Sequence, residues 1–400
     1  VTFPNSLASF SWLPWVLSLL APGLGHRQEQ ERRAAWAGGL LGVAFLAGEP
    51  VTAALGGAVA VATTLAFWRR LPLTLPVGAA LVAGPVLLPL LLAYPHTTRG
   101  ELGVPPGALA ADCLAPRRWL ELFFPRILGE PLGDGASGFW AAPSFPWLRY
   151  YPWVLLGAAP AFLLCFAART KGNAGRLAWG LFAGGLVLAA LPCWLEQLLQ
   201  GLPGVAAWRY GIKGLQLSAL AVPLLTGWGY QAWNARGERK APVFAASFFC
   251  LLALFPGTWR ALLARLYPAS AAALAQVPAE RFAVWLRWDA AANAVPLLAL
   301  LLPPPAATAA VAGFACLQFL PALAPVPADA WEDPPPLARA LPPGTALACF
   351  VESTAWQEPA EDAVRARLFA FRDALGPDYG IPFGLRYVLA RGPDGLEALQ

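Results

Sequence analysis

Long apolar runs, separated by short polar turns, recur along most of the chain. A membrane-crossing helix needs about 20 largely apolar residues. The pattern therefore predicts that residues 1–326 form an all-α polytopic membrane domain with about ten transmembrane helices. The runs lie near residues 7–24, 34–48, 51–68, 72–94, 151–168, 177–199, 214–234, 242–258, 288–303 and 306–325.

The pattern changes after residue 326, where charged residues become common and long apolar runs stop. Residues 345–351 and 383–389 are predicted strands, the second by its alternation. Residues 361–375 are a predicted helix, because apolar residues recur there near helical spacing. Residues 327–400 are thus expected to be the start of a small α/β or α+β domain, truncated at the end of the chain.

The composition agrees with a membrane protein, since 58% of the residues are hydrophobic, 13% are charged and the mean hydropathy is +0.54. Soluble domains carry roughly 45–50% apolar and about 25% charged residues. The net charge is +5, but the basic residues lie mostly in short turns, where membrane orientation explains them. Membrane lipids are therefore expected partners, and nucleic acid is not.

The positive charges also predict the orientation of the chain. Cytoplasmic loops of membrane proteins are enriched in Lys and Arg, so the short basic turns should face the cytoplasm. The longer loops at 95–150, 200–213 and 259–287, and everything after residue 326, should then lie outside. The basic residues of the predicted inner turns are Arg27, Arg32, Arg33, Arg69, Arg70, Arg169, Lys171, Arg176, Arg236, Arg239 and Lys240.

The residue usage favours a bacterial source. Ala, Gly, Pro and Arg are abundant, which suggests a GC-rich genome, so we expect a multi-pass protein of the bacterial cytoplasmic (inner) membrane with an extracytoplasmic C-terminal domain. The chain contains no Met and begins with Val1. These features, and an N-terminus expected outside, suggest a fragment with at least one helix upstream.

The loop at 200–213 carries the main candidate site, formed by Arg209, Tyr210 and Lys213. Arg209 and Lys213 are four residues apart and share one face if the next helix begins here. Two cations at the outer surface have the chemistry to hold a phosphate, Arg through its planar fork and Lys as a point charge. The alternative is that both side chains simply reach lipid headgroups.

Three carboxylates and one amide are further candidates. Glu49 lies at the tip of a tight hairpin, where it either orients a substrate or is a solvated turn residue. Glu196, Asp289 and Asn293 lie at or near the ends of apolar runs. Ionisable groups within a membrane suggest function, but near a helix end they can also reach water.

Two long outer segments are rich in aromatic residues. The loop at 95–150 contains residues 119–125 (Trp-Leu-Glu-Leu-Phe-Phe-Pro), and Trp140, Trp147, Tyr150 and Trp153 follow. These rings either anchor the chain at the interface or line a groove for a lipid or sugar. Residues 259–287 are predicted to form one or two amphipathic helices on the outer surface.

No sequence motif for a metal or cofactor is present. The chain has two His and six Cys with no paired short spacing, so no zinc or redox motif is expected. Cys165, Cys193, Cys250 and Cys316 lie within apolar runs and are predicted to be small packing residues. No phosphate-binding glycine loop, nucleophile elbow or zinc-binding helix motif occurs. No cofactor is therefore identified, and the need for a divalent metal stays open.

Four stretches, taken in order, resemble the YfhO-type bacterial membrane proteins, which are relatives of the GT-C glycosyltransferases. Gly211 departs from the family pattern, which often has Pro there, and Asp378 stands where Asn is frequent. The stretches are Trp12-Leu13-Pro14 with Ala47-Gly48-Glu49-Pro50; Leu122-Phe123-Phe124-Pro125; Leu202-Pro203-Gly204 with Trp208-Arg209-Tyr210 and Lys213; and Leu375-Gly376-Pro377-Asp378-Tyr379-Gly380 with Gly384.

The resemblance implies a GT-C-like helical fold and a membrane glycosyltransferase that moves a sugar from a polyprenyl-phosphate donor to an extracytoplasmic acceptor, a cell-envelope glycan or lipid. In such enzymes a carboxylate on the first outer loop takes the acceptor proton, and cations stabilise the departing phosphate. Arg209 and Lys213 match the cation position. The catalytic carboxylate is expected upstream of Val1, so no catalytic residue is assigned within the fragment.

Two other functions use the same features. A transporter or flippase of a lipid-linked or anionic substrate would use the outer cations without needing a carboxylate base. A non-catalytic membrane scaffold would use its outer domain to bind a partner. The sequence does not specify the donor sugar, the acceptor or the oligomeric state.

Overall fold

The computed structural model describes residues 9–21, 27–47, 50–93, 113–129, 156–168, 170, 172–195, 211–268, 271–319, 339, 346–348 and 386–389. Most of these residues are helical. The α-helices are α2 (Leu13–Leu20), α3 (Arg27–Leu46), α4 (Pro50–Trp68), α5 (Thr74–Ala93), α7 (Ala158–Ala167), α8 (Asn173–Ala190), α10 (Leu215–Asn234), α11 (Lys240–Ala253), α12 (Pro256–Leu266), α13 (Ala271–Gln276), α14 (Ala279–Ala299) and α15 (Pro304–Phe319). Two 3-10 helices, η2 (Pro116–Leu122) and η5 (Gly211–Gly214), lie between them.

The predicted number of about ten transmembrane helices is wrong. Among the described residues, two helices are long and apolar enough to cross a membrane, Val51–Trp68 within α4 and Asn173–Leu195, which contains α8. Helices α11 and α12 meet at a bend of 84° and give a third span only if they are taken as one. The apolar runs therefore predicted the positions of the helices correctly, but they did not predict which helices are long and apolar enough to span a membrane.

The other helices fall short for reasons that are visible in their sequences. Helices α2 and α7 have 8 and 10 residues, which extend about 12 to 15 Å, against a hydrocarbon core of about 30 Å. Helix α3 begins with a charged segment, and α5 contains Pro85 and Pro89. Helix α14 carries Arg281, Arg287 and Asp289 within its 21 residues.

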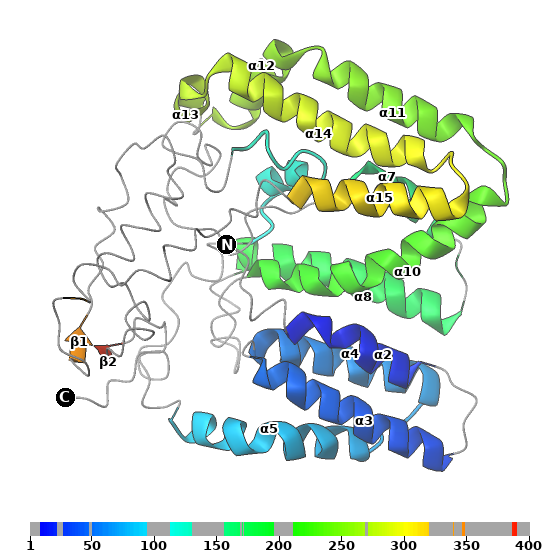
Figure 1. Ribbon diagram of the computed structural model, residues 1–400, viewed down its shortest axis with the longest axis vertical. Helices are drawn as coiled ribbons and strands as arrows, with labels where there is room; N and C mark the ends of the chain where they lie inside the picture. Colours follow the sequence, from blue (N-terminus) through cyan, green and yellow to red (C-terminus); the bar gives the residue numbers. More distant parts are fainter. Residues whose placement is uncertain are drawn as a thin grey trace.

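The long helices lie side by side in roughly one direction, from α5 at one edge to α11 at the other (Figure 1). Their turns therefore gather at two ends. One end, which we call the basic end, contains the start of α3, the α4–α5 turn, the start of α8 and the α10–α11 turn (Figure 1). The basic residues of these segments are Arg27, Arg32, Arg33, Arg69, Arg70, Arg176, Arg236, Arg239 and Lys240.

Contacts between turns hold the basic end together. Arg70 Nη1 lies 3.2 Å from Glu31 Oε1, which joins the α4–α5 turn to the start of α3. Asn173 Nδ2 donates to the Ala66 carbonyl at 2.8 Å and joins α8 to α4. Three basic segments that are far apart in sequence, the start of α3, the α4–α5 turn and the start of α8, are thus in contact at one end of the helical stack, as expected if they share one side of a membrane.

The opposite end, which we call the disulfide end, contains the Cys113–Cys193 disulfide, η2, η5 and the first residues of α4 and α10 (Figure 1). The buried apolar residues between the two ends divide into several clusters. One cluster joins α2, α3, α4, α5 and α10, and another joins α12, α13, α14 and the segment after η2.

Helices α3 and α5 pack closely because small residues face each other. A Cβ on Gly38 would overlap the Leu75 carbonyl oxygen, and one on Gly42 would lie 2.6 Å from Val82 Cβ. Small residues at such contacts let helix backbones approach each other in membrane proteins.

Gly38→Ala should therefore lower the free energy of unfolding by about 1–3 kcal/mol, because overpacking at a rigid backbone contact forces the helices apart. The matched control is Gly39→Ala, where the nearest atom is Val82 Cγ2 at 4.0 Å. The control should be neutral or stabilising by up to about 1 kcal/mol. Thermal unfolding in detergent measures both, and equal effects would argue against close α3–α5 packing.

The described C-terminal residues form two short strands, β1 (Ala346–Ala348) and β2 (Arg386–Leu389), which pair in parallel. The predicted helix at 361–375 lies outside the described residues. The described residues therefore do not support the predicted α/β or α+β domain, because two short strands alone do not define a domain.

Candidate functional site

The structure places one of the four predicted binding residues. Lys213 is the third residue of η5 and is buried, with 5% of its surface exposed. Glu49, Arg209 and Tyr210 lie outside the described residues. Lys213 is thus not an exposed surface side chain, and both functions considered for it, phosphate binding and contact with lipid headgroups, stay predictions.

Two glycines hold η5 against the last turns of α8. A Cβ on Gly214 would lie 2.8 Å from the Ala189 backbone nitrogen, and one on Gly211 would lie 2.7 Å from Pro192 Cγ. Any larger residue at either position would separate η5 from α8. This explains the small residues at positions 211 and 214, and it fixes the backbone that carries Lys213.

A buried hydrogen bond joins α10 to α4. Thr52 Oγ1 donates to Gln216 Oε1 at 2.9 Å. Thr52 lies three residues after Glu49, and Gln216 lies three residues after Lys213. Thr52 and Gln216 are 164 positions apart in sequence. Their hydrogen bond therefore brings the segment after Glu49 into contact with the segment after Lys213 at the disulfide end.

The Cys113–Cys193 disulfide ties the segment before η2 to the end of α8. The Leu114 backbone N–H also donates to the Ala189 carbonyl at 2.8 Å, and Ile212 packs in the same apolar cluster as Leu114. The prediction that Cys193 is only a packing residue is wrong. The available signal was that residue 113 and the end of the run at 177–199 both lie at the predicted outer side, where oxidising conditions allow disulfides.

A buried ion pair lies within η2. Arg118 Nε and Nη2 donate to the two carboxylate oxygens of Glu121, each at 2.9 Å. Both side chains are buried. Bidentate Arg–carboxylate pairs of this kind are among the strongest salt bridges in proteins. The sequence offered only the i, i+3 spacing as a signal for this pair.

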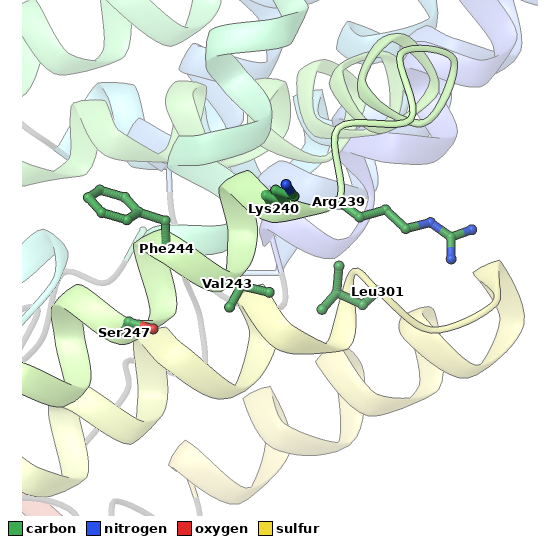
Figure 2. A pocket seen from close by; sticks show the side chains of 6 residues that line it. All are labelled: Arg239, Lys240, Val243, Phe244, Ser247 and Leu301. Carbon is green, nitrogen blue, oxygen red and sulfur yellow. The ribbon is translucent and has the colours of Figure 1, made fainter.

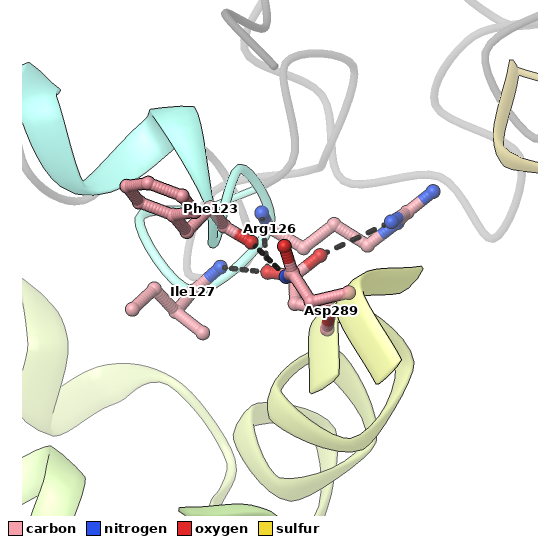
Figure 3. Close-up of polar contacts among 5 residues, drawn as sticks. Phe123, Arg126, Ile127 and Asp289 are labelled. Atoms are coloured by element: carbon pink, nitrogen blue, oxygen red, sulfur yellow. Dashed lines mark hydrogen bonds and ion pairs between the residues drawn. The ribbon is translucent and has the colours of Figure 1, made fainter. Parts of the chain in front are cut away.

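Asp289, on α14, holds the segment that follows η2 (Figure 3). Its carboxylate accepts hydrogen bonds from the backbone N–H groups of Arg126 at 2.8 Å and Ile127 at 3.2 Å. The Arg126 guanidinium donates to the other carboxylate oxygen at 3.1 Å. The Asp289 side chain is fully buried, so its charge is balanced entirely by groups inside the protein.

Asn293 extends this network by one helical turn. Its Nδ2 donates to the carbonyls of Phe123 at 2.6 Å and Asp289 at 2.7 Å, and its Oδ1 accepts from the Ala158 N–H at 2.8 Å. Asp289 and Asn293 together connect α14 to the segment after η2 and to the start of α7. Neither residue therefore needs a substrate to explain its position.

Three described cations at the disulfide end are buried, but Arg118 and Arg126 are each paired with a buried carboxylate, Glu121 and Asp289. The third, Lys213, lies in η5, which packs on the end of α8. Charges in such surroundings act more strongly on an anion than charges in water do. Among the described residues, no group of three or more His, Cys, Asp or Glu side chains could hold a metal ion.

Comparison of the chain with protein-family models, curated proteins and solved structures found no match. The resemblance to YfhO-type proteins therefore rests on the sequence motifs alone.

Proposed function

We propose that this chain belongs to a membrane glycosyltransferase that moves a sugar from a polyprenyl-phosphate donor to an extracytoplasmic acceptor, a cell-envelope glycan or lipid. The observation that carries the proposal is Lys213, a buried cation at the disulfide end beside the starts of α4 and α10. The motif resemblance independently implies a phosphate-binding cation at Lys213.

The two ends of the helical stack support the orientation that this reaction needs. Disulfides persist in oxidising compartments such as the bacterial periplasm and cell surface, which favours an extracytoplasmic position for the disulfide end. The basic turns lie at the opposite end, as the positive-inside rule requires of a cytoplasmic surface. Lys213 would then face the leaflet in which a lipid-linked sugar donor is consumed.

The proposed reaction assigns a role to each candidate residue. The acceptor hydroxyl oxygen attacks the anomeric carbon, its proton passes to a carboxylate base, and the bond from that carbon to the phosphate oxygen breaks. Its electron pair leaves with the polyprenyl phosphate. Lys213 and Arg209 balance the charge on that phosphate, while Tyr210 and Glu49 orient the bound donor.

Lys213→Met should lower sugar transfer by about 100-fold, since loss of one group that stabilises the transition-state charge has an effect of that size. Membranes that contain the full-length protein, supplied with a radiolabelled polyprenyl-phosphate sugar, provide the assay. Lys213→Arg should retain part of the activity because it keeps the charge, and Arg209→Ala should abolish transfer.

The matched control is Arg176→Ala, which removes an exposed cation at the basic end and should leave transfer unchanged. Disulfide formation and membrane insertion are measured for every variant, so a folding defect is distinguished from a defect in chemistry. Unchanged transfer by Lys213→Met would remove Lys213 from the reaction. Loss of lipid-linked sugar translocation, without any transfer in the parent protein, would favour a flippase instead.

A further inference from the structure

A groove of about 560 Å³ lies at the basic end, between the first two turns of α11 and the turn that joins α14 to α15 (Figure 2). It is separate from the disulfide end and from every residue assigned to sugar transfer. Its lining combines two cations, one hydroxyl and three apolar side chains: Arg239, Lys240, Ser247, Val243, Phe244 and Leu301.

Arg239 and Lys240 are both part of the lining, which contains no carboxylate. The nearest acidic residue in sequence is Glu238, whose Oε1 lies 4.0 Å from Arg236 Nη1 and which is not among the lining residues. The groove also lies beside the N-terminal turn of α11, where the helix dipole favours an anion. The charges at this site therefore complement a negatively charged group.

Apolar side chains continue from these cations along α11. Val243, Phe244, Phe248 and Leu251 recur at helical spacing and are exposed, Phe244 to 80%. From Phe244 to Leu251 the helix rises about 10 Å. This length fits within one leaflet, about half of a hydrocarbon core that is about 30 Å thick.

We propose that this groove binds one anionic phospholipid of the cytoplasmic leaflet, with its phosphate at Arg239 and Lys240 and an acyl chain along the exposed face of α11. The cation pair alone would suit any phosphate, but the apolar side chains that continue from it suit a phosphate that carries a chain. Anionic leaflets attract basic clusters next to membrane helices in the same way. This inference rests on the orientation of the chain and does not depend on sugar transfer.

Native mass spectrometry of the full-length protein in detergent tests the inference, with dioleoyl phosphatidylglycerol and dioleoyl phosphatidylcholine as probes. The parent protein should retain phosphatidylglycerol preferentially. The double variant Arg239→Ala/Lys240→Ala should weaken that binding by roughly tenfold or more. Ser247→Trp, which fills the groove and keeps both cations, should also weaken it.

The control is Arg32→Ala/Arg33→Ala, which removes the same charge elsewhere at the basic end and should leave the preference intact. Inorganic phosphate, added as a competitor, should not displace the lipid. The inference is overturned if both double variants behave alike, if the two lipids bind equally to the parent protein, or if inorganic phosphate competes effectively.

Discussion

Asp289→Ala should lower the free energy of unfolding by about 3–5 kcal/mol, the cost of removing one partner from a buried ion pair. The substitution leaves the Arg126 guanidinium and the backbone N–H groups of Arg126 and Ile127 without the carboxylate that they contact at 2.8–3.2 Å. Unfolding of the purified protein in detergent, by heat or denaturant, measures the loss.

Two further variants accompany Asp289→Ala: a conservative change of Asp289 and a control on the same helix. Asp289→Asn keeps one acceptor oxygen and should have an intermediate effect. Glu280→Ala removes an exposed carboxylate from the first turn of the same helix and should cost less than about 1 kcal/mol. A loss below about 1 kcal/mol for Asp289→Ala would show that α14 does not hold the segment after η2.

Loss of the Cys113–Cys193 disulfide should lower the free energy of unfolding by about 2–4 kcal/mol, because the bond closes a loop between residues 80 positions apart and so restricts the unfolded chain. The double variant Cys113→Ser/Cys193→Ser reports this loss. It should also lower sugar transfer, since the bond ties the end of α8 to the segment before η2, and η5 packs on that end of α8.

The matched control replaces Cys165 and Cys250, which are free and exposed, by Ser. This control should unfold like the parent protein. On a non-reducing gel, only the parent protein and this control should change mobility when a reductant is added. If the Cys113/Cys193 variant unfolds like the control, the disulfide contributes nothing to stability.

The sequence predicted helix positions well because helix formation in apolar runs depends on local composition. Each predicted apolar run overlaps a described helix, from 34–48 with α3 to 306–325 with α15, and the run at 242–258 overlaps two, α11 and α12. The number of membrane spans could not be predicted in the same way. Apolar content alone did not account for the charged first turns of α3, the shortness of α7, or the polar residues within α14.

The candidate site was less predictable because its contacts are long-range. The Asp289 network joins residues 163 positions apart, and no local pattern indicates such a pairing. Lys213 was identified from the cluster of cations in its loop, but no local pattern indicated that it is buried. The close packing of its element η5 on the end of α8 depends on Gly211 and Gly214, whose role appears only when the two elements meet. Glu49, Arg209 and Tyr210 stay predictions.

The account depends on the disulfide end and the basic end lying on opposite sides of the membrane. Single-cysteine labelling tests this most directly, in a background with Cys165, Cys250, Cys316 and Cys349 replaced by Ala. The two probes are Arg265→Cys, an exposed position on α12 within the predicted outer segment 259–287, and Arg32→Cys, an exposed position at the basic end. Both variants are treated in intact cells with an impermeant maleimide. We expect that reagent to label position 265 readily and position 32 only after the membrane is permeabilised. Labelling of position 32 alone in intact cells would contradict the account.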